Sequence, residues 1–242
     1  MNLIVGTYNI QHGKSFLESQ RQGKEVIDLT QLANAIKQTG VQLCALNEVM
    51  CGGLPFGNQP EALAKSLGYT SVFGRAIMVG DCEYGNALLS AFPVQSIRTV
   101  PICTVPEQRR GKGFYEDRVL LSADLAIENR ILTFMTCHFG LMPEEQELAV
   151  NTIIQEVERI HNPLIFAGDL NFTPDHPNYM RLCTALQDTA TGFDGMFQTF
   201  PSDKPTEKID YLFISHDCKT ERIWVPEIVC SDHRPYLAEI SF

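Results

Sequence analysis

Residues 163–171 read PLIFAGDLN, an apolar run that ends abruptly in a glycine, a carboxylate and a carboxamide. An apolar run bounded by turn-forming residues is typical of a buried strand, which we predict over 164–168, and the end of such a strand can meet a ligand. Asp169 and Asn171 would be costly beside a core without partners or a function. Because a strand followed by an Asx turn also explains the stretch, other segments of the chain must decide.

Composition indicates a single folded domain. The chain has 242 residues, of which 44% are hydrophobic and 20% are charged, as in ordinary globular proteins. No linker-like stretch divides it, so we predict one domain over 1–242. No apolar run approaches the ~20 residues of a membrane span, and we therefore predict no membrane-spanning segment.

The charge balance is acidic and argues against extended binding of duplex nucleic acid. The formal net charge is −10, from 19 basic and 29 acidic residues. A protein that neutralises many backbone phosphates is expected to have a basic surplus or a basic stripe. The densest basic cluster is Arg109, Arg110 and Lys112, which is small. A local cationic site for one phosphate remains compatible with this composition.

The eight cysteines are predicted to be reduced thiols. No two of them form a Cys-x-x-Cys pair, whereas disulfide frameworks and zinc ribbons need close, patterned spacing. Cys44 and Cys137 lie inside apolar runs, where a thiol behaves as a small core side chain. Reduced thiols, together with an amino terminus that lacks the features of a signal peptide, predict a cytoplasmic protein.

The rest of the chain alternates between strand-like and helix-like patterns. Glu128 and Asn129 separate two β-rich runs, as in a hairpin. Strands are predicted over 3–10, 43–46, 69–73, 86–91, 95–103, 118–127, 130–137, 209–214, 221–225 and 236–240, and helices over 29–40, 61–67, 144–160 and 180–186. Residues 51–60 and 104–116 are predicted surface loops. Many strands with a few helices favour two packed sheets covered by helices, an α/β sandwich.

Several predicted strands end in polar residues that make chemical sense as a set. These residues are Asn9, Glu48, His138, Asp169 with Asn171, Asp210, and Asp232 with His233. A hard divalent cation such as Mg²⁺ or Mn²⁺ takes oxygen ligands and keeps waters for a substrate phosphate. Glu48, Asp232 and the amide oxygen of Asn9 are candidate ligands. Zinc is less favoured, because the chain has no His-x-x-x-His or paired cysteines.

The other members of the set are suited to phosphate chemistry. His233, oriented by Asp210, could act as a general base or hold charge at the reacting phosphate. His138 and Asn171 are donors suited to the extra negative charge of a pentavalent transition state. Asp169 would position and polarise the attacking water. The pattern indicates metal-assisted hydrolysis of a phosphate ester.

The chain also resembles the endonuclease/exonuclease/phosphatase superfamily, which is related in fold to DNase I. The matching stretches follow the family's order from residue 7 to 235; they are TYNI (7–10), LNEV (46–49), YGNALLS (84–90), EDR (116–118), TCHF (136–139), GDLN (168–171), TFP (199–201), IDY (209–211) and SDHRP (231–235). Each stretch is short, but their joint order is specific. The resemblance covers nearly the whole chain.

This resemblance implies a four-layer α/β sandwich, in which two mostly antiparallel sheets pack together between helices and the site lies at one edge. It implies a Mg²⁺- or Mn²⁺-dependent hydrolase of phosphate esters. The implied roles are these: Glu48 as the principal metal ligand, with Asn9 and Asp232 near the metal; Asp169 as the water-activating residue; Asn171 and His138 at the scissile phosphate; Asp210 and His233 as a carboxylate–histidine pair; and Arg118 and Asn86 close to the site.

Two positions depart from the family pattern. Many members have a glutamine before the metal-binding glutamate, and this chain has the shorter Asn47. Some DNA-repair members have an aspartate two residues after the first asparagine, where this chain has Gln11, which weakens the case for repair activity.

Structural roles remain as alternatives for three of the site residues. Asn9 could cap a turn, His138 could be a core-edge histidine, and the Arg118 stem could cover apolar surface. For the whole protein, the prediction is a phosphodiesterase that uses direct in-line attack by water. The alternatives are a nuclease acting on short or single-stranded DNA or RNA, and a catalytically silent binding module. Loops 51–60 and 104–116 are expected to set substrate choice.

Overall fold

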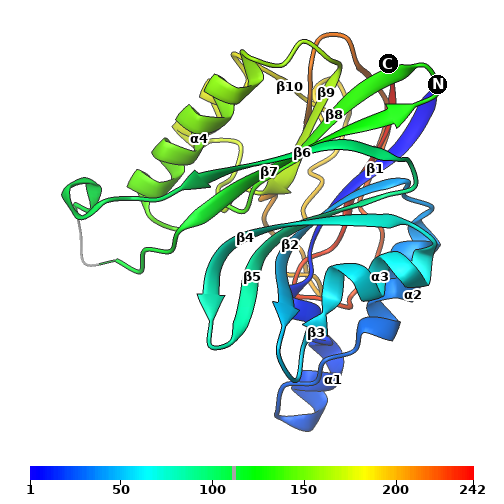
Figure 1. Ribbon diagram of the computed structural model, residues 1–242, viewed down its shortest axis with the longest axis vertical. Coiled ribbons are helices and arrows are strands. Elements are labelled where there is room, and N and C mark those ends of the chain that lie inside the picture. Colours follow the sequence, from blue (N-terminus) through cyan, green and yellow to red (C-terminus); the bar gives the residue numbers. More distant parts are fainter. Residues whose placement is uncertain (111–112) are drawn as a thin grey trace.

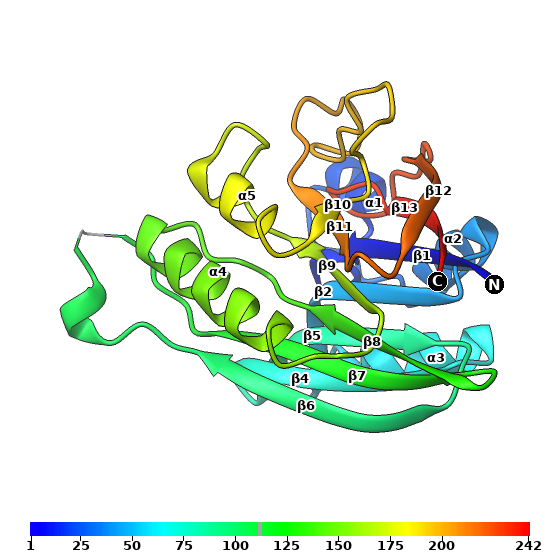
Figure 2. The same ribbon diagram turned by 90° about the horizontal axis from the view of Figure 1, so that it is seen from above.

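The computed structural model describes residues 1–110 and 113–242 of the chain. Two β-sheets pack face to face, and helices lie on both outer faces (Figures 1 and 2). The predicted four-layer α/β sandwich is therefore confirmed. Lys112 of the basic cluster, and positions 111–112 of the predicted 104–116 loop, lie outside the described residues.

The first sheet has seven strands within the described ranges, in the order β12-β13-β1-β2-β5-β4, with β3 paired to β2. Its strands are β1 (Asn2–Asn9), β2 (Leu43–Gly52), β3 (Gly57–Asn58), β4 (Thr70–Val79), β5 (Cys82–Ser90), β12 (Lys219–Trp224) and β13 (Tyr236–Ser241). The β1–β2 pair is parallel, and the other pairs are antiparallel.

The second sheet has six strands within the same ranges, in the order β10-β11-β9-β8-β7-β6. Its strands are β6 (Val94–Ile102), β7 (Arg118–Ile127), β8 (Arg130–Thr136), β9 (Leu164–Asp169), β10 (Gln187–Asp188) and β11 (Asp210–Ile214). Only β8 and β9 of these pair in parallel. The predicted hairpin at Glu128 and Asn129 is the β7–β8 connection.

Helices cover the outer faces of both sheets. The helices are α1 (Phe16–Gln22), α2 (Leu29–Thr39), α3 (Gln59–Leu67), α4 (Pro143–Val157) and α5 (Pro177–Leu182), with 3₁₀ turns at Gln11–Gly13 and Pro106–Gln108. Apolar residues of α2 and α3 pack on β1, β2 and β5, and those of α4 and α5 pack on the six-stranded sheet. None of these helices is long and apolar enough to cross a membrane.

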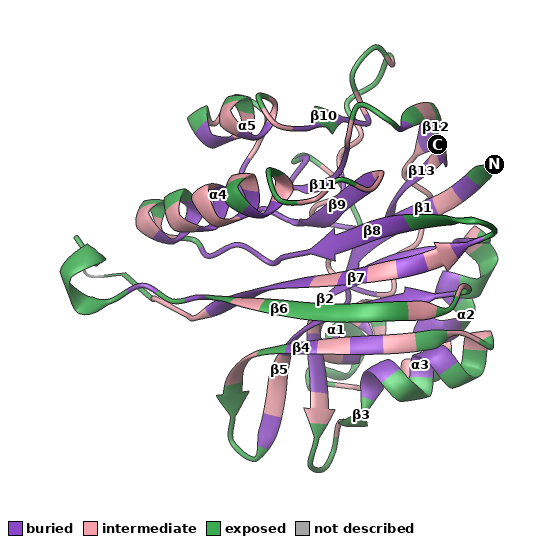
Figure 3. Cartoon of the chain, turned by 45° about the horizontal axis from the view of Figure 1, so that its top comes forward, coloured by how far each residue is buried: buried purple, intermediate pink, exposed green. Residues whose placement is uncertain are grey.

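Alternation along the strands separates three apolar clusters. Leu43 and Ala45 of β2 face the space between the sheets, whereas Cys44 and Leu46 face the helices. Successive side chains of a strand point to opposite faces, so one strand contributes to two layers of core. Strands β8 and β9 are almost continuously buried, while much of the edge strand β6 is exposed (Figure 3).

Local signals explain where helix α2 begins and ends. The Asp28 carboxylate accepts a hydrogen bond from the main-chain N–H of Gln31, as an N-cap does. Gly40 then adopts a left-handed conformation with φ of +70° and closes the helix as predicted.

The structure also differs from the sequence-based expectations. No helix is predicted before residue 29, but the chain forms the short and largely polar helix α1 there. The predicted loop 51–60 is partly ordered, because β2 continues to Gly52 and β3 and the start of α3 follow. Strands β4 and β5 extend into a long hairpin. The last residues of β4 are exposed, whereas β5 begins with the buried Cys82, so the burial pattern fades only along β4.

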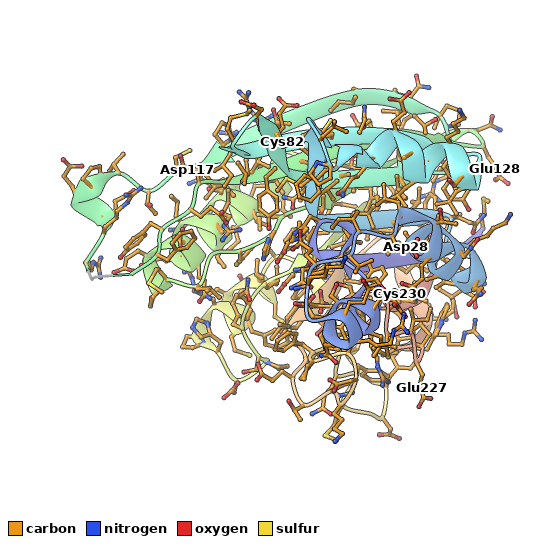
Figure 4. All side chains as sticks on the ribbon, turned by 90° about the horizontal axis from the view of Figure 1, so that it is seen from below. Asp28, Cys82, Asp117, Glu128, Glu227 and Cys230 are labelled. Atoms are coloured by element: carbon orange, nitrogen blue, oxygen red, sulfur yellow. The ribbon has the colours of Figure 1, made fainter. Side chains whose placement is uncertain are left out.

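The eight cysteines are all free thiols. Cys82 and Cys230, for example, lie well apart in Figure 4. This agrees with the predicted reduced state.

Candidate active site

The polar strand ends meet at one edge of the sandwich, between the two sheets. Asn9 ends β1 and Asp169 ends β9, and His138 follows β8 by two residues. Strand β11 runs antiparallel to β9, so its first residue, Asp210, pairs directly with Asp169. Within each of the parallel pairs β1–β2 and β8–β9, the carboxyl ends of the two strands lie side by side at this edge.

A β-bulge directs Glu48 toward this edge. The register between β2 and β5 shifts between Leu46 and Val49, so Asn47 and Glu48 together face Asn86. Glu48 has a positive φ of +58°, which is uncommon for a residue with a side chain. A bulge changes the direction of the side chains it carries. Here Asn47 is buried between the sheets, and the half-buried Glu48 contacts Asn9.

Asn9 joins the two sides of the site. Its amide nitrogen Nδ2 donates to Glu48 Oε1 at 2.9 Å and to Asp169 Oδ2 at 3.1 Å. Its amide oxygen accepts a hydrogen bond from the main-chain N–H of Gln11 at 3.0 Å. The Asn9 side chain is only 1% exposed. Its nitrogen, rather than its oxygen, thus faces the two carboxylates.

Asp169, Asp210 and His233 form a compact buried cluster. His233 Nδ1 lies 2.8 Å from Asp210 Oδ2, and His233 Nε2 lies 3.6 Å from Asp169 Oδ2. Thr199 donates its hydroxyl to the same Asp210 oxygen, and the Phe200 ring packs at 4.9 Å from the His233 ring. Asp210 therefore contacts the histidine with which it is predicted to pair.

The environment of the cluster shifts the pKa values of two of its members. Burial, with the nearby Asp210 charge, raises the pKa of Asp169 to about 7, although His233 and the Asn9 hydrogen bond oppose this shift. Burial alone would lower the pKa of His233, but Asp210 and Asp169 outweigh it and raise the pKa to about 10. His233 is therefore cationic at neutral pH.

His138 lies between Arg118 and Asn171. The Arg118 Nη1 atom is 3.3 Å from His138 Nδ1, and Asn171 Nδ2 is 3.1 Å from His138 Nε2. A guanidinium can only donate, so the first contact requires an unprotonated Nδ1. Burial and the charges of Arg118 and His233 hold the pKa of His138 well below its usual range. His138 is therefore neutral.

Arg118 and Asn171 are themselves held in place. Arg118 Nη2 pairs with Glu116 Oε2 at 2.8 Å. The Asn171 side chain donates to the Phe139 carbonyl at 2.9 Å, and its main-chain N–H donates to Asp169 Oδ1 at 2.9 Å. Asn171 and His138, the donors predicted to face the phosphate, are thus held beside Asp169 by hydrogen bonds to neighbouring groups.

Gly168 allows the end of β9 to approach β8 closely. A Cβ atom at this position would lie 2.0 Å from the main-chain oxygen of Cys137. Any other residue would push the two strands apart, which explains the glycine before Asp169.

Asp232, which precedes His233 in the chain, is half-buried. Its carboxylate oxygen Oδ1 accepts a hydrogen bond from the Ser231 hydroxyl at 3.0 Å. Asp232 and Gln11 line a hollow of about 360 Å³, and Lys14, Lys24 and Glu25 also line it. Asp232 is thus near Gln11 and outside the compact cluster.

The donor set fits a hard divalent cation. Gln11 Oε1 and Asp210 Oδ1 are buried acceptor oxygens without a hydrogen-bond partner among the described residues. Glu48 adds a carboxylate beside Asn9, and oxygen atoms are the ligands that Mg²⁺ and Mn²⁺ prefer. The described residues contain one close carboxylate–histidine group, Asp169, Asp210 and His233. Glu48 and Asp232 are not part of it.

A second hollow, of about 550 Å³, opens from Asn171. Phe172 and His176 stack on its wall, with ring centroids 5.0 Å apart. Asp175 and Glu207 also line it, and no lysine or arginine does so among the described residues.

Sequence reasoning missed several residues that support the site. Glu116 belongs to the EDR stretch, in which the sequence pattern points only to Arg118. Thr199 donates its hydroxyl to Asp210. It belongs to the TFP stretch, whose residues could equally serve packing when only the sequence is considered.

Asn86, by contrast, is predicted to lie near the site, and its amide oxygen accepts a hydrogen bond from Asn47 at 2.8 Å. The roles predicted for the individual site residues remain predictions.

Comparison with known proteins gives a consistent picture. Residues 6–233 match the family described as Endonuclease/Exonuclease/phosphatase family. The chain is 22% identical over 228 residues to the uncharacterized protein YbhP of Escherichia coli K12, covering 88% of each chain.

Two solved structures illustrate the similarity of fold. An endonuclease/exonuclease/phosphatase from Bacteroides vulgatus has a TM-score of 0.80 and 20% identity, covering 100% of this chain and 99% of that one. The mannosyl-6-phosphatase Bt3783 of Bacteroides thetaiotaomicron has a TM-score of 0.73 and 17% identity, covering 99% and 100%. At these identities the likeness shows the fold alone.

Proposed function

Because this chain belongs to the endonuclease/exonuclease/phosphatase family, we propose that it is a Mg²⁺- or Mn²⁺-dependent phosphodiesterase that hydrolyses its substrate by direct in-line attack of water. Family membership supports a hydrolase acting on phosphate esters in the broad sense. The observation that carries the finer proposal is the buried Asp169–Asp210–His233 cluster beside the neutral His138 and the Asn171 amide.

Each part of this arrangement has a chemical role in the proposal. Asp169 Oδ2, near both imidazole Nε2 atoms, accepts a proton from the attacking water. The cationic His233, held by Asp210, stabilises developing negative charge or protonates the leaving oxygen. His138 and the Asn171 amide donate toward the phosphoryl oxygens.

The cation would be held chiefly by Glu48, with Asp232 and the Asn9 side chain near it. When bound, it supplies Lewis-acid stabilisation of the phosphoryl and leaving oxygens. The unpartnered oxygens of Gln11 and Asp210 in the described part of the chain support a cation at this edge.

A nuclease acting on short or single-stranded DNA or RNA is the second candidate. Lys14 and Lys24 in the hollow beside Asp232 favour it, because they could contact one further phosphate. The hollow beside Asn171 opposes extended binding, because it has Asp175 and Glu207 and no basic lining residue among those described. We therefore rank a small phosphodiester above a nucleic acid. The complete polar set argues against a silent binding module.

The decisive experiment is an activity panel with Mg²⁺ or Mn²⁺. The panel contains phosphomonoesters, bis(4-nitrophenyl) phosphate, dinucleotides, single-stranded and abasic DNA, RNA and inositol phosphates. We expect diester hydrolysis that a chelator abolishes and Mg²⁺ restores, and Asp169→Ala should lower turnover by at least ~10²-fold. Full activity in excess chelator, or a wild-type rate for Asp169→Ala, would contradict the proposal.

The proposal extends to domain organisation and location. The chain forms a single domain over 1–242, which the three apolar clusters shared among distant segments support. The protein is cytoplasmic, which the free cysteines support.

A further inference from the structure

Asn47 stands at the contact between the two sheets directly behind the site. Its side chain is fully buried. Its oxygen Oδ1 accepts from the main-chain N–H of Asp169 at 2.9 Å. Strand β2 of one sheet therefore holds the last residue of β9 in the other sheet.

The Asn47 side chain is in turn fixed by buried partners. Its nitrogen Nδ2 donates to Asn86 Oδ1 at 2.8 Å and lies 3.3 Å from the Thr136 hydroxyl, a weaker contact. Asn86 donates to the Val119 carbonyl at 2.9 Å. Asn47, Asn86 and Thr136 are at most 2% exposed. We call these three side chains and the Asp169 N–H the Asn47 bridge.

Its place in the chain connects the bridge to both halves of the site. Asn47 immediately precedes Glu48 in the β-bulge, and its acceptor oxygen meets the residue that carries the Asp169 carboxylate. Asn47 is thus joined through the chain to the predicted metal ligand and through a hydrogen bond to the residue that carries the predicted water-activating carboxylate. In a regular strand without the bulge, consecutive side chains would point to opposite faces.

We propose that Asn47 is a positioning residue, which holds Asp169 in place through its main-chain N–H and couples it to Glu48. This inference rests on the proposed function, because it assumes that Asp169 acts on the attacking water. A displacement of about 1 Å in a reacting group can cost roughly 10²-fold in rate. Asn47 should therefore affect turnover without touching the substrate.

The test compares Asn47→Ala with Thr189→Val as a matched control. The Thr189 hydroxyl, one residue beyond β10, lies 3.0 Å from the Tyr236 hydroxyl of β13, and both residues are fully buried. Both substitutions remove a buried polar contact between the two halves of the sandwich, but Thr189 takes no part in the hydrogen bonds described for the site. Amide hydrogen exchange of Asp169 is the first readout, and kcat and KM with bis(4-nitrophenyl) phosphate are the second.

In Asn47→Ala, exchange of the Asp169 N–H should accelerate at least about tenfold. The kcat should fall about 10- to 100-fold while KM changes less than about threefold. In Thr189→Val, the exchange rate of the Asp169 N–H and the kcat should stay near their wild-type values. Unchanged Asp169 exchange in Asn47→Ala, or a kcat equal to that of Thr189→Val, would overturn the inference.

Asn47→Asp provides a second variant in case Asn47→Ala does not fold. It keeps the acceptor for the Asp169 N–H but loses the donor to Asn86, so exchange should stay slow while kcat falls about three- to tenfold. Fast exchange, or full activity, in Asn47→Asp would contradict the inference. If the wild type hydrolyses no diester, the proposed function fails, whereas the exchange measurement still decides whether the bridge holds Asp169.

Discussion

The two sides of the site differ in how tightly their polar groups are bonded to one another. On one side, Asp169, Asp210 and His233 form a compact cluster, in which Asp210 Oδ2 is bonded twice while Asp210 Oδ1 has no partner among the described residues. On the other side, Glu48 accepts a hydrogen bond from the Asn9 side chain, and Gln11 keeps an unpartnered buried oxygen within the described residues. We call these the closed side and the open side.

The difference suggests how the work of the site is divided. A closed cluster fixes geometry and proton positions before a substrate arrives, which is what proton transfer needs. Oxygens without partners are costly when buried, and the proposed cation would satisfy them. Asn9 spans the two sides, since its amide nitrogen donates to both Glu48 and Asp169. Substitutions on each side should therefore have different consequences.

The largest expected effect is on the closed side. His233→Asn removes the cation that faces Asp169 Oδ2 and should lower kcat by roughly 10²- to 10⁴-fold. The exposed His161→Asn is the matched control and should leave kcat unchanged. Steady-state kinetics on the best substrate of the panel measures both. Comparable rates for the two variants would remove His233 from the proposed chemistry.

The second effect is a dependence on pH that also belongs to the closed side. Asp169 must be ionised to accept a proton, and its pKa is raised to about 7. The rate constant kcat/KM should therefore rise by up to about a hundredfold from pH 5 to pH 8. A profile that is flat from pH 5 upward would show that Asp169 is already ionised there.

The raised pKa of Asp169 also makes the stability of the folded protein depend on pH. Asp169 in the folded state keeps a proton that the unfolded chain releases above the ordinary aspartate pKa of 3.8. Its contribution to stability is complete below that value and is lost as pH rises through about 7. Asp169→Asn, measured by denaturant unfolding, should flatten this part of the curve between pH 4 and pH 7.

On the open side, the expected effect is on the metal requirement. Glu48→Gln should raise the Mg²⁺ concentration for half-maximal activity by about 10- to 100-fold, because a neutral amide binds a divalent cation more weakly than a carboxylate does. Glu128→Gln, at the exposed β7–β8 turn labelled in Figure 4, is the control. An unchanged Mg²⁺ requirement would remove Glu48 from the proposed metal ligands.

The smallest effect concerns the support of His138. Glu116→Gln keeps a hydrogen-bond acceptor but removes the charge that pairs with Arg118, and it should lower kcat/KM about three- to tenfold, which corresponds to the net contribution of about one ordinary hydrogen bond. The exposed Glu158→Gln should have no effect. A loss as large as that of His233→Asn would indicate that Glu116 acts on the reaction directly.

Much of this protein could be predicted from local sequence patterns. The apolar run at 164–168 forms β9, and Gly40 ends α2, because burial and backbone preferences act over a few residues. The acidic and amide residues that follow the strands also indicate the site, since polar groups at the ends of buried strands need partners.

Tertiary structure decided which of these groups meet. The bulge at Asn47 and Glu48, the donation of the Asn9 nitrogen rather than its oxygen toward the carboxylates, and the Glu116–Arg118 pair depend on strand register and on contacts between the sheets. Asn47 and Asp169 are 122 positions apart in the chain and share a hydrogen bond only because β2 and β9 pack against each other. Local patterns reveal which residues are polar and where strands end, but contact across two sheets is set by the packing of the whole domain.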